Sequence, residues 1–335
     1  MASIKDVAAR AGVSAATVSR VLNEHPAVSP DTRARVLAAV AELEYRPNAL
    51  ARSLRTAQTR TIGLVVSDVL NPFFTELARA VEDEARALGY SVVIGNADEQ
   101  PRLQDHHIAT LLDRRIDGLL LSPADGASPL LRETVREGSV PLVFVDRWIP
   151  GLDGVPVVRA DGCAAIRDLV RHLHALGRRR LAIIAGPAAT TTGRERIGAF
   201  RAALAELGLT LPQEYIGQGD FQADSGRRSA AGFLELPEPP DAVFAADNLM
   251  ALGALDEFRG RGLRVPEDIA LAAFDDIPWF PHTAPPITAI AQPTRELGRA
   301  AVRALADRIE GRTASSVTLS ARLVARRSCG EPERT

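Results

Sequence analysis

The sequence predicts an α/β protein in which a small helical head precedes a body of two lobes, each built on a doubly wound parallel sheet. Residues 1–46 contain short helical patterns separated by turns and no strand-like run. From residue 61 onward, apolar runs of strand length alternate with amphipathic helical stretches, and the alternation forms two successive sets. The chain has 335 residues, 46% of them hydrophobic, which is ample for several globular cores.

The head is predicted to be a helix-turn-helix followed by a third helix. The expected helices cover residues 4–11, 15–23 and 30–44. Gly12 permits a tight turn between the first two, and the small Ala8 lets them approach. A helix-turn-helix of this kind lays its second helix in the DNA major groove.

An apolar core is expected to hold these helices together. The first two helices would contribute Val7, Val13, Val18 and Val21, and the third would contribute Val36, Leu37, Val40 and Leu43. Ser29 is placed to cap the third helix, where Pro30 suits the first helical position.

The second helix presents a short polar surface that carries one arginine. The residues expected to face DNA are Ser14, Ala15, Ala16, Thr17, Ser19, Arg20 and Asn23. Arg20 is the candidate for bidentate recognition of guanine, whereas the two alanines could only pack against a thymine methyl. The hydroxyls and the amide are expected to contact phosphates. Residues 1–60 hold nine Lys/Arg and five Asp/Glu, so a basic head precedes an acidic body.

Residues 47–60 are predicted to form a hinge helix and a linker. Pro47 disfavours helix at the preceding residue, and Asn48 can cap a new helix that runs through Arg55. An isolated helix of this length is marginal in water, so we expect it to form when something packs against it.

The body is expected to contain two sets of strands and helices. The first has strands at residues 61–66, 91–97, 117–122 and 141–146, with helices at 72–88, 100–115 and 129–137. The second has strands at 180–185, 214–217, 241–246 and 268–274, with helices at 193–207, 224–234 and 249–261. Continuous apolar runs of this kind suit parallel strands that are buried on both faces.

The end of the chain is expected to cross between the lobes. Residues 288–292 and the helix 293–309 would return to the first lobe, and residues 317–326 to the second, so that the crossings form a hinge. The expected boundaries are 1–46 for the head, 47–60 for the hinge and linker, 61–157 plus 289–314 for the first lobe, 158–288 plus 315–330 for the second, and 331–335 for a tail.

Ligands of open α/β sheets bind beyond the carboxyl ends of the strands. Residues at or just beyond those ends form the candidate effector site: Phe73, Phe74, Ser122, Asp146, Thr192, Arg196, Phe221, Asp247 and Asp275. Aromatic faces beside charged groups suit a small polyhydroxylated or heterocyclic ligand. Other interpretations stay open: Phe74 as a core residue, Asp146 and Asp247 as caps, and Asp276 as a cap or surface carboxylate.

The chain resembles the lactose-repressor family of bacterial transcription regulators, in particular its purine and ribose repressor members. The residues that carry the resemblance run from Ile4-Lys5-Asp6-Val7-Ala8 through Val18-Ser19-Arg20-Val21-Leu22-Asn23, then Tyr45-Arg46-Pro47-Asn48 and Ala51-Arg52-Ser53-Leu54. The resemblance continues through essentially the whole chain. It implies a periplasmic-binding-protein-like body and a repressor whose affinity for operator DNA is controlled by an effector bound between the lobes.

The resemblance also implies roles for particular residues, among them DNA contacts of the hinge helix at Asn48, Ala51 and Leu54. Leu54 matches a leucine that wedges into the central base step of the operator, and an apolar wedge can kink DNA in this way. Effector contacts are implied at Phe73, Phe74, Arg196, Phe221 and Asp275. Two departures bear on the ligand: Thr190 stands where the purine repressor has an arginine that reads its base, and Ala246 stands where lactose-type members have an asparagine. A sugar or sugar phosphate is therefore the expected effector, with a purine or nucleoside corepressor as the alternative, and both induction and corepression stay open.

Other classes of protein fit the sequence less well. The chain has no phosphate-binding glycine-rich loop, no paired-cysteine motif and no nucleophile elbow, so we expect neither an enzyme nor a cofactor. His172 and His174 are two apart on an expected helix and cannot share a metal, and Cys163 is expected to be buried.

The sequence shows no signal peptide or membrane-spanning run, and only two cysteines, which predicts a bacterial cytoplasmic protein that associates with the nucleoid when bound to its operator. No heptads follow residue 327, so we expect a homodimer on a pseudo-palindromic operator. A sugar-binding protein without a DNA role is the remaining alternative.

Overall fold

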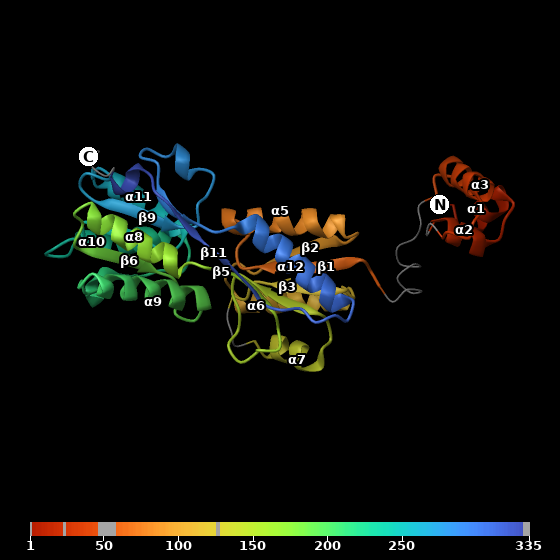
Figure 1. Ribbon diagram of the computed structural model, residues 1–335, viewed down its shortest axis with the longest axis horizontal. Coiled ribbons are helices and arrows are strands. Elements are labelled where there is room, and N and C mark those ends of the chain that lie inside the picture. The colour runs from red at the N-terminus through yellow and green to blue at the C-terminus, as the bar shows by residue number, and fades with distance from the viewer. Residues whose placement is uncertain (1, 23–24, 46–57, 125–127, 331–335) are drawn as a thin grey trace. The chain divides into compact units, whose positions relative to one another are not determined.

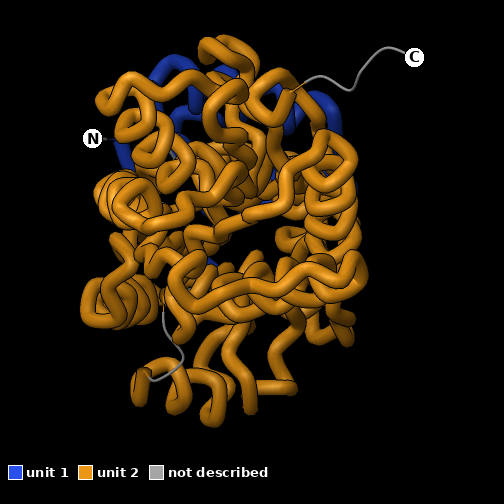
Figure 2. The backbone as a smooth tube through the Cα atoms, turned by 90° about the vertical axis from the view of Figure 1, so that its left-hand side faces the viewer, with its two compact units in different colours: residues 1–59 blue, residues 60–335 orange. Residues whose placement is uncertain are grey.

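The computed structural model describes residues 2–22, 25–45, 58–124 and 128–330. The chain divides into two compact units, Met1–Thr59 and Arg60–Thr335 (Figure 2). The predicted hinge contacts Asn48, Ala51 and Leu54, together with Asn23, lie outside the described residues.

The described part of the first unit contains three helices, α1 (Ile4–Ala11), α2 (Ala15–Leu22) and α3 (Pro30–Glu42) (Figure 1). A capping box starts α1: the Ser3 hydroxyl accepts from the Asp6 backbone, and the Asp6 carboxylate accepts from the Ser3 backbone. The hydrogen bonds that the Asp6 carboxylate accepts from the backbone and the hydroxyl of Ser3 lower the pKa of Asp6. Gly12 ends α1 with φ 66°, a left-handed conformation that glycine adopts without steric cost. The helix-turn-helix therefore forms where it was predicted.

The core of the head matches the predicted stripe with one correction. Val7, Val18 and Val36 are completely buried. Leu37 was predicted to join them but is 48% exposed, and Ala39 is buried instead. A stripe through Val36 on a helix of 3.6 residues per turn continues three residues later, whereas the adjacent position points away from it.

The first lobe of the second unit is a six-stranded sheet in the order β11-β5-β4-β3-β1-β2. Its strands are β1 (Thr61–Val66), β2 (Ser91–Asn96), β3 (Gly118–Leu121), β4 (Leu142–Val145), β5 (Val157–Asp161) and β11 (Val317–Ser320), all paired in parallel. Its helices are α5 (Pro72–Ala87), α6 (Pro101–Asp113), α7 (Pro129–Glu137) and α12 (Thr294–Ile309). Helices α5 and α12 pack on one face of the sheet, and α6 and α7 on the other (Figure 1).

The second lobe is a second six-stranded sheet, in the order β12-β10-β9-β8-β6-β7. Its strands are β6 (Leu181–Ala185), β7 (Ile216–Gln218), β8 (Ala242–Ala245), β9 (Ala270–Phe274), β10 (Thr288–Ala291) and β12 (Arg322–Val324), and only β12 is antiparallel to its neighbour. Its helices are α8 (Cys163–Ala175), α9 (Thr191–Glu206), α10 (Ala223–Leu234) and α11 (Asn248–Gly260), and the short helices are η1 (Gln213–Tyr215), η2 (Phe280–His282) and η3 (Arg327–Cys329). A Cβ at Gly253 would lie 1.8 Å from the Ala223 carbonyl oxygen, so glycine is required where α10 crosses α11.

Three short strands near the crossings between the lobes differ from the prediction. Strand β5 was not predicted and extends the first sheet to Asp161, beyond the boundary expected at residue 157. Residues 288–291 were assigned to the first lobe but pair with β9 in the second, whereas residues 317–320 were assigned to the second lobe but pair with β5 in the first. Only α12 returns to the first lobe as predicted. These short strands carry a local pattern that predicts a strand, but the choice of sheet depends on distant partners.

The crossing segments lie side by side at the hinge, since the backbone N–H of Ala321 donates to the Asp161 carbonyl at 2.9 Å. Cys163, at the start of α8, was predicted to be buried but is exposed, whereas Cys329 is buried. Across the described ranges, no helix is long and apolar enough to cross a membrane.

Candidate functional site

The outer surface of α2 carries the residues predicted to face DNA. Arg20 and Ala16 are exposed, while Ala15 is half-buried and packs against the core of the head. The Ser14 hydroxyl caps α2 by accepting from the Thr17 backbone at 3.1 Å, and it also lies 2.9 Å from the Thr17 hydroxyl. Arg20 is thus the exposed arginine of this helix, and the two hydroxyls stabilise the start of the helix.

Several strands of the body end in residues with a left-handed backbone. The φ angles are 66° at Asp146 after β4, 65° at Phe221 after β7, 68° at Asp275 after β9 and 52° at Glu99 after β2. This conformation is uncommon for residues other than glycine and is unusual for a bulky side chain such as phenylalanine. Such strain concentrates at functional sites, where the turn sets the direction of the side chain. These strand ends meet where the two lobes face one another.

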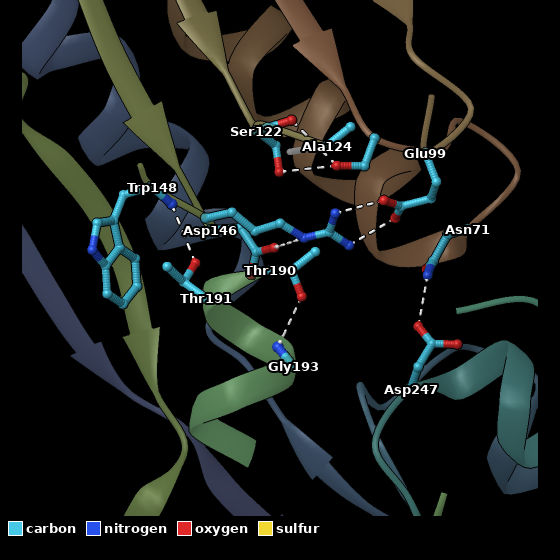
Figure 3. A network of polar contacts seen from close by, with 12 residues as sticks. Asn71, Glu99, Ser122, Ala124, Asp146, Trp148, Thr190, Thr191, Gly193 and Asp247 are labelled. Atoms are coloured by element: carbon cyan, nitrogen blue, oxygen red, sulfur yellow. Dashed lines mark hydrogen bonds and ion pairs between the residues drawn. The ribbon is translucent and has the colours of Figure 1, made fainter. Parts of the chain in front are cut away.

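Arg147 is the central cation on the first lobe's side of this cleft. Its two terminal nitrogens donate to both oxygens of Glu99, each at 2.7 Å, in a bidentate pair (Figure 3). Its guanidinium carbon lies 4.7 Å from the Phe221 ring centroid on the other lobe and 6.0 Å from that of Phe74. The side chain is almost completely buried, so its charge depends on these partners.

Arg196, on α9, is the corresponding cation of the second lobe. It donates to the Ala246 carbonyl at 2.7 Å and lies 3.9 Å from the Asp275 carboxylate. Its guanidinium carbon is 3.7 Å from the Phe274 ring centroid. Asp275 in turn accepts from Gln292 at 2.6 Å, and Gln292 follows β10 at a crossing between the lobes. The cleft cation is therefore connected through Asp275 to the hinge.

A second group of contacts joins the lobes directly. The Asn71 amide donates to Asp247 at 3.0 Å (Figure 3). The Asn248 amide donates to the Asn71 side-chain oxygen at 2.8 Å. Beside them, Gln222 donates to Asp68 at 3.0 Å. Asn71 caps α5 and Asp247 caps α11, so the two helix starts face one another across the cleft. We call this group the inter-lobe latch: Asp68, Asn71, Gln222, Asp247 and Asn248.

Two further contacts between the lobes lie near Trp148. The Trp148 backbone N–H lies 3.4 Å from the Thr191 hydroxyl, as Figure 3 shows, and Arg159 donates to Glu195 at 3.0 Å. The Arg159 guanidinium also lies 4.7 Å from the Trp148 ring centroid. The lobes are thus bridged by residues separate from the inter-lobe latch.

A small cavity of about 20 Å³ remains between the lobes, lined by Asp146, Thr192 and Arg196 among others. That is room for roughly one water molecule. The Thr192 hydroxyl and the Arg147 Nε are buried without a hydrogen-bond partner. Buried polar atoms are normally paired, and of these two the Thr192 hydroxyl belongs to a residue that lines the cavity, where a polar ligand would satisfy it. Larger hollows of about 450 Å³ lie on outer faces, for example one bordered by Arg264 and Glu267.

The carboxyls of the cleft are unusually basic. Burial raises the pKa of Asp247 to about 7, and the neighbouring Asp275 raises it as well. Burial raises the pKa of Asp146 to about 6, because the opposing effect of Arg196 and Arg147 is incomplete. Burial also raises the pKa of Asp275. At neutral pH some of these groups hold a proton and can donate a hydrogen bond to a ligand hydroxyl.

The structure brings most of the predicted effector residues to this cleft. Asp146, Thr192 and Arg196 line the small cavity, Phe73 and Asp275 line a neighbouring one, and Phe221 packs on Arg147. Ser122 is different, since it is buried within the first lobe with its hydroxyl 3.4 Å from that of Ser67.

For four residues the sequence left open a role as a core residue, a helix cap or a surface group, and their contacts show which role each has. Phe74 belongs to the apolar core of the first lobe and also lies beside Arg147. Asp247 is a helix cap, because it accepts from the backbone of Leu249 and Met250, and it also contacts the opposite lobe. The Asp146 side chain lies near Arg147 and shows no capping contact among those described. Asp276 forms a bidentate ion pair with Arg326 and is neither a cap nor a free surface group.

Sequence reasoning missed Glu99, Gln222 and Gln292 as cleft residues. Asn71 precedes a proline at the start of a helix, and that pattern predicts its capping role. No local pattern predicts that the same side chain reaches the other lobe. Glu99 follows β2 in a polar turn that resembles any surface loop.

Comparison with known proteins gives two matching family profiles. Residues 3–48 match the family described as bacterial regulatory proteins, lacI family, and residues 170–329 match the periplasmic binding protein-like domain. The ribose operon repressor of Escherichia coli (strain K12) is 39% identical over 310 residues, which are 92% of this chain and 93% of that protein.

Two solved structures are similar over nearly the whole chain. The lac repressor dimer bound to operator and the anti-inducer ONPF has a TM-score of 0.86 at 30% identity, with 98% of this chain and 99% of that one covered. The transcriptional regulator CelR in complex with cellobiose has a TM-score of 0.74 at 34% identity, with 98% and 100% covered.

Proposed function

The chain belongs to the lacI family of bacterial regulatory proteins, and from that premise we propose that the cleft described above binds a sugar which sets the affinity of the head for operator DNA. The protein is a DNA-binding transcriptional repressor of this family. The proposal concerns the ligand, the residues that hold it and the way in which binding is transmitted.

The observation that carries the proposal is the buried set of rings and charged groups between the lobes. Phe73, Phe74 and Phe221 offer flat apolar faces, while Asp146, Arg196 and Asp275 offer hydrogen-bonding groups around a cavity. Sugars present the same combination, with C–H faces that stack on rings and hydroxyls that make bidentate hydrogen bonds. The solved complex of CelR with cellobiose and the likeness to a ribose operon repressor support a sugar.

Binding requires the lobes to separate. The cavity of about 20 Å³ is too small for a monosaccharide, so the inter-lobe latch has to open before a ligand can enter. A ligand held between the lobes then favours their closure around it, in an arrangement wider than the one in this structure, because it contacts both lobes only when they close. The latch and the contacts near Trp148 are the bonds that exchange during this motion.

The DNA side of the proposal rests on α2 and on the hinge. Arg20 is assigned to a guanine, and Ser14, Ala15, Ala16, Thr17, Ser19 and Asn23 to the surrounding contacts. Asn48, Ala51 and Leu54 are assigned to the minor groove at the centre of the site, where Leu54 would unstack a base step. The protein acts as a homodimer on a pseudo-palindromic operator, as the dimeric lac repressor bound to its operator supports.

A purine or nucleoside effector is the second candidate. The aromatic rings could stack on a base, but Thr190 occupies the position at which the purine repressor has an arginine that reads its base. The Thr190 hydroxyl is already used within its own turn, accepting from Gly193 at 3.0 Å and donating to Pro187 at 2.9 Å. The cleft favours a sugar for this reason.

We further propose that the protein is not an enzyme and acts in the cytoplasm. The relatives that match the whole chain are repressors. Within the described ranges, no group of three or more His, Cys, Asp and Glu side chains could hold a metal ion.

The test is a thermal-shift screen of sugars, sugar phosphates, nucleosides and nucleobases with the full-length protein, followed by operator binding with each compound that stabilises it. A true effector raises the melting temperature by mass action and changes operator affinity. Stabilisation by a sugar with a change in operator affinity supports the proposal. Stabilisation by nucleobases alone contradicts it.

A further inference from the structure

The buried and partly buried side chains at the cleft carry more acidic than basic groups. Among those described above, the acidic groups are Asp68, Glu99, Asp146, Asp247 and Asp275, and the basic groups are Arg147 and Arg196. Burial is the main cause of the raised pKa values of Asp146 and Asp247, and the neighbouring Asp275 raises both further. A ligand with further negative charge would increase the repulsion in a site that water cannot screen.

The Arg147 guanidinium is the group to which an anion would bind if Glu99 did not already pair with it. Both of its terminal nitrogens donate to Glu99 at 2.7 Å, which is the arrangement that a phosphate would need to replace. Its Nε lies 3.8 Å from Asp146, and its flat face packs 4.7 Å from the Phe221 ring centroid. Glu99 therefore occupies the edge of Arg147 that recognises anions.

Carboxylates close to Arg196 oppose the binding of an anion there. A carboxylate lies beside it at 3.9 Å, its Nη1 donates to the Ala246 carbonyl, and its face covers the Phe274 ring. Two further carboxyls, those of Asp146 and Glu195, line the same cavity as Arg196. A phosphate placed against this guanidinium would also face these acidic groups.

We propose that Glu99 is a specificity-determining positioning residue: it holds Arg147 in a closed ion pair and thereby restricts this cleft to uncharged polyhydroxylated effectors, excluding their phosphorylated forms. The inference rests on the proposed function, since it concerns the ligand of the same cleft. Arg147 then keeps its Nε beside Asp146 and its flat face on the Phe221 ring. Glu99 acts through Arg147 and needs no contact with the ligand itself.

The experiment compares neutral and phosphorylated probes on the full-length protein. Melting temperatures are measured with D-ribose and ribose 5-phosphate, D-glucose and glucose 6-phosphate, adenosine and AMP, and with sodium phosphate against sodium chloride at equal ionic strength. In the wild-type protein we expect stabilisation only by neutral members and none by phosphate beyond that of chloride. A phosphorylated probe or inorganic phosphate that stabilises the wild type as well as the neutral partner does overturns the proposal.

The variant Glu99→Gln keeps the shape of the side chain and removes its charge. We expect it to gain saturable binding of inorganic phosphate, with an affinity at least about tenfold above that of the wild type, and to lose the gain in the double variant Glu99→Gln/Arg147→Gln. The matched control is Glu84→Gln, which neutralises a carboxylate paired with Arg303 on α12, away from the cleft. The control should behave like the wild type toward phosphate.

These arms separate the two proposals. If no sugar stabilises the wild type but Glu99→Gln gains phosphate binding that depends on Arg147, the sugar effector is wrong and the role of Glu99 stands. If Glu99→Gln folds and gains no phosphate binding, the role of Glu99 is wrong whatever the sugars do. If Glu99→Gln does not fold, the wild-type comparison decides alone.

Discussion

The side-chain amide of Asn71 donates a 3.0 Å hydrogen bond to the carboxylate of Asp247, and each of these residues caps a helix of a different lobe. The pair therefore connects the starts of α5 and α11 across the cleft. Both residues are buried, so the bond exists in a protected environment and is lost when the lobes separate. Closure of the body can be examined through this one contact.

The substitution Asn71→Asp should open the lobes. Aspartate caps a helix as well as asparagine does, so α5 stays intact, but the variant loses the donor and places a second carboxylate against Asp247. We expect a larger radius of gyration by small-angle scattering at pH 8 and roughly tenfold weaker binding of the sugar found in the screen. Asn71→Ser, which caps the helix without adding charge, should lose less affinity for the sugar. Wild-type dimensions and affinity for Asn71→Asp at pH 8 would contradict the role of the latch.

The cleft should become less stable as the pH rises through neutrality. The folded-state pKa values of Asp146 and Asp247, about 6 and about 7, exceed the ordinary value of 3.8. The stability contributed by the protonated carboxyls is therefore complete below pH 3.8 and is lost as the pH rises through 6 to 7. We expect the melting temperature of Asp146→Asn to fall less between pH 5.5 and pH 8 than that of the wild type. Parallel pH profiles of the two proteins would disprove this assignment.

Two adjacent carboxylates should behave differently when each is neutralised. Asp275 lies beside Arg196, whereas Asp276 forms an ion pair with Arg326 within the second lobe. Asp275→Asn should weaken sugar binding by about 30-fold or more, since it leaves a buried cation without its partner, and should spare operator affinity without effector. Asp276→Asn should lower the melting temperature and leave sugar binding unchanged. The measurement is the sugar affinity of both variants by calorimetry. Wild-type affinity in Asp275→Asn would show that Asp275 is not part of the binding site.

Arg20→Ala should relax the choice of operator. A bidentate arginine contact with guanine contributes roughly 1–3 kcal/mol of discrimination, so the variant should lose about tenfold or more in affinity for the best site and much less for unrelated DNA. The control is Arg35→Ala, an exposed arginine of α3 that pairs with Asp31. The measurement is anisotropy with operators selected from random DNA. Unchanged discrimination by Arg20→Ala would place the base contacts on other residues.

Leu54→Ala should reduce the bending of the operator. An inserted apolar side chain unstacks a base step and kinks the duplex, and the added contact offsets that cost. We expect weaker operator binding and a smaller bend angle in a circular-permutation assay. Leu50→Ala, a leucine four residues earlier in the same segment, is the comparison. A bend angle equal to that of the wild type would rule out the wedge.

The sequence was a good guide to elements and a poor guide to pairing. Helix caps and the spacing of apolar residues depend only on neighbouring residues in the sequence. The starts of the helices after Ser29 and Asn71, and the apolar runs that form β1 and β6, could therefore be predicted. The sheet to which residues 288–291 belong depends on β9 and β12, and such partners leave no mark on a four-residue strand. The same reason explains the missed strand β5.

The candidate site was predictable as far as its strand ends. Asp146, Phe221 and Asp275 follow apolar runs, and residues there meet at one edge of a sheet. Their left-handed backbones could not be predicted, because φ at these positions is imposed by the surrounding fold. Glu99 shows the same limit, since its importance comes from Arg147, which lies 48 residues away in the sequence.

The central claim is that a sugar bound between the lobes controls the affinity of the head for operator DNA. The most direct measurement is operator affinity of the wild type and Asp275→Asn, titrated with the sugar that stabilises the wild type. The account predicts that saturating sugar changes the wild-type dissociation constant by at least about fivefold, which is the lower end of usual allosteric coupling, and leaves that of Asp275→Asn unchanged. Operator affinity that does not respond in the wild type, or responds equally in both proteins, would contradict it.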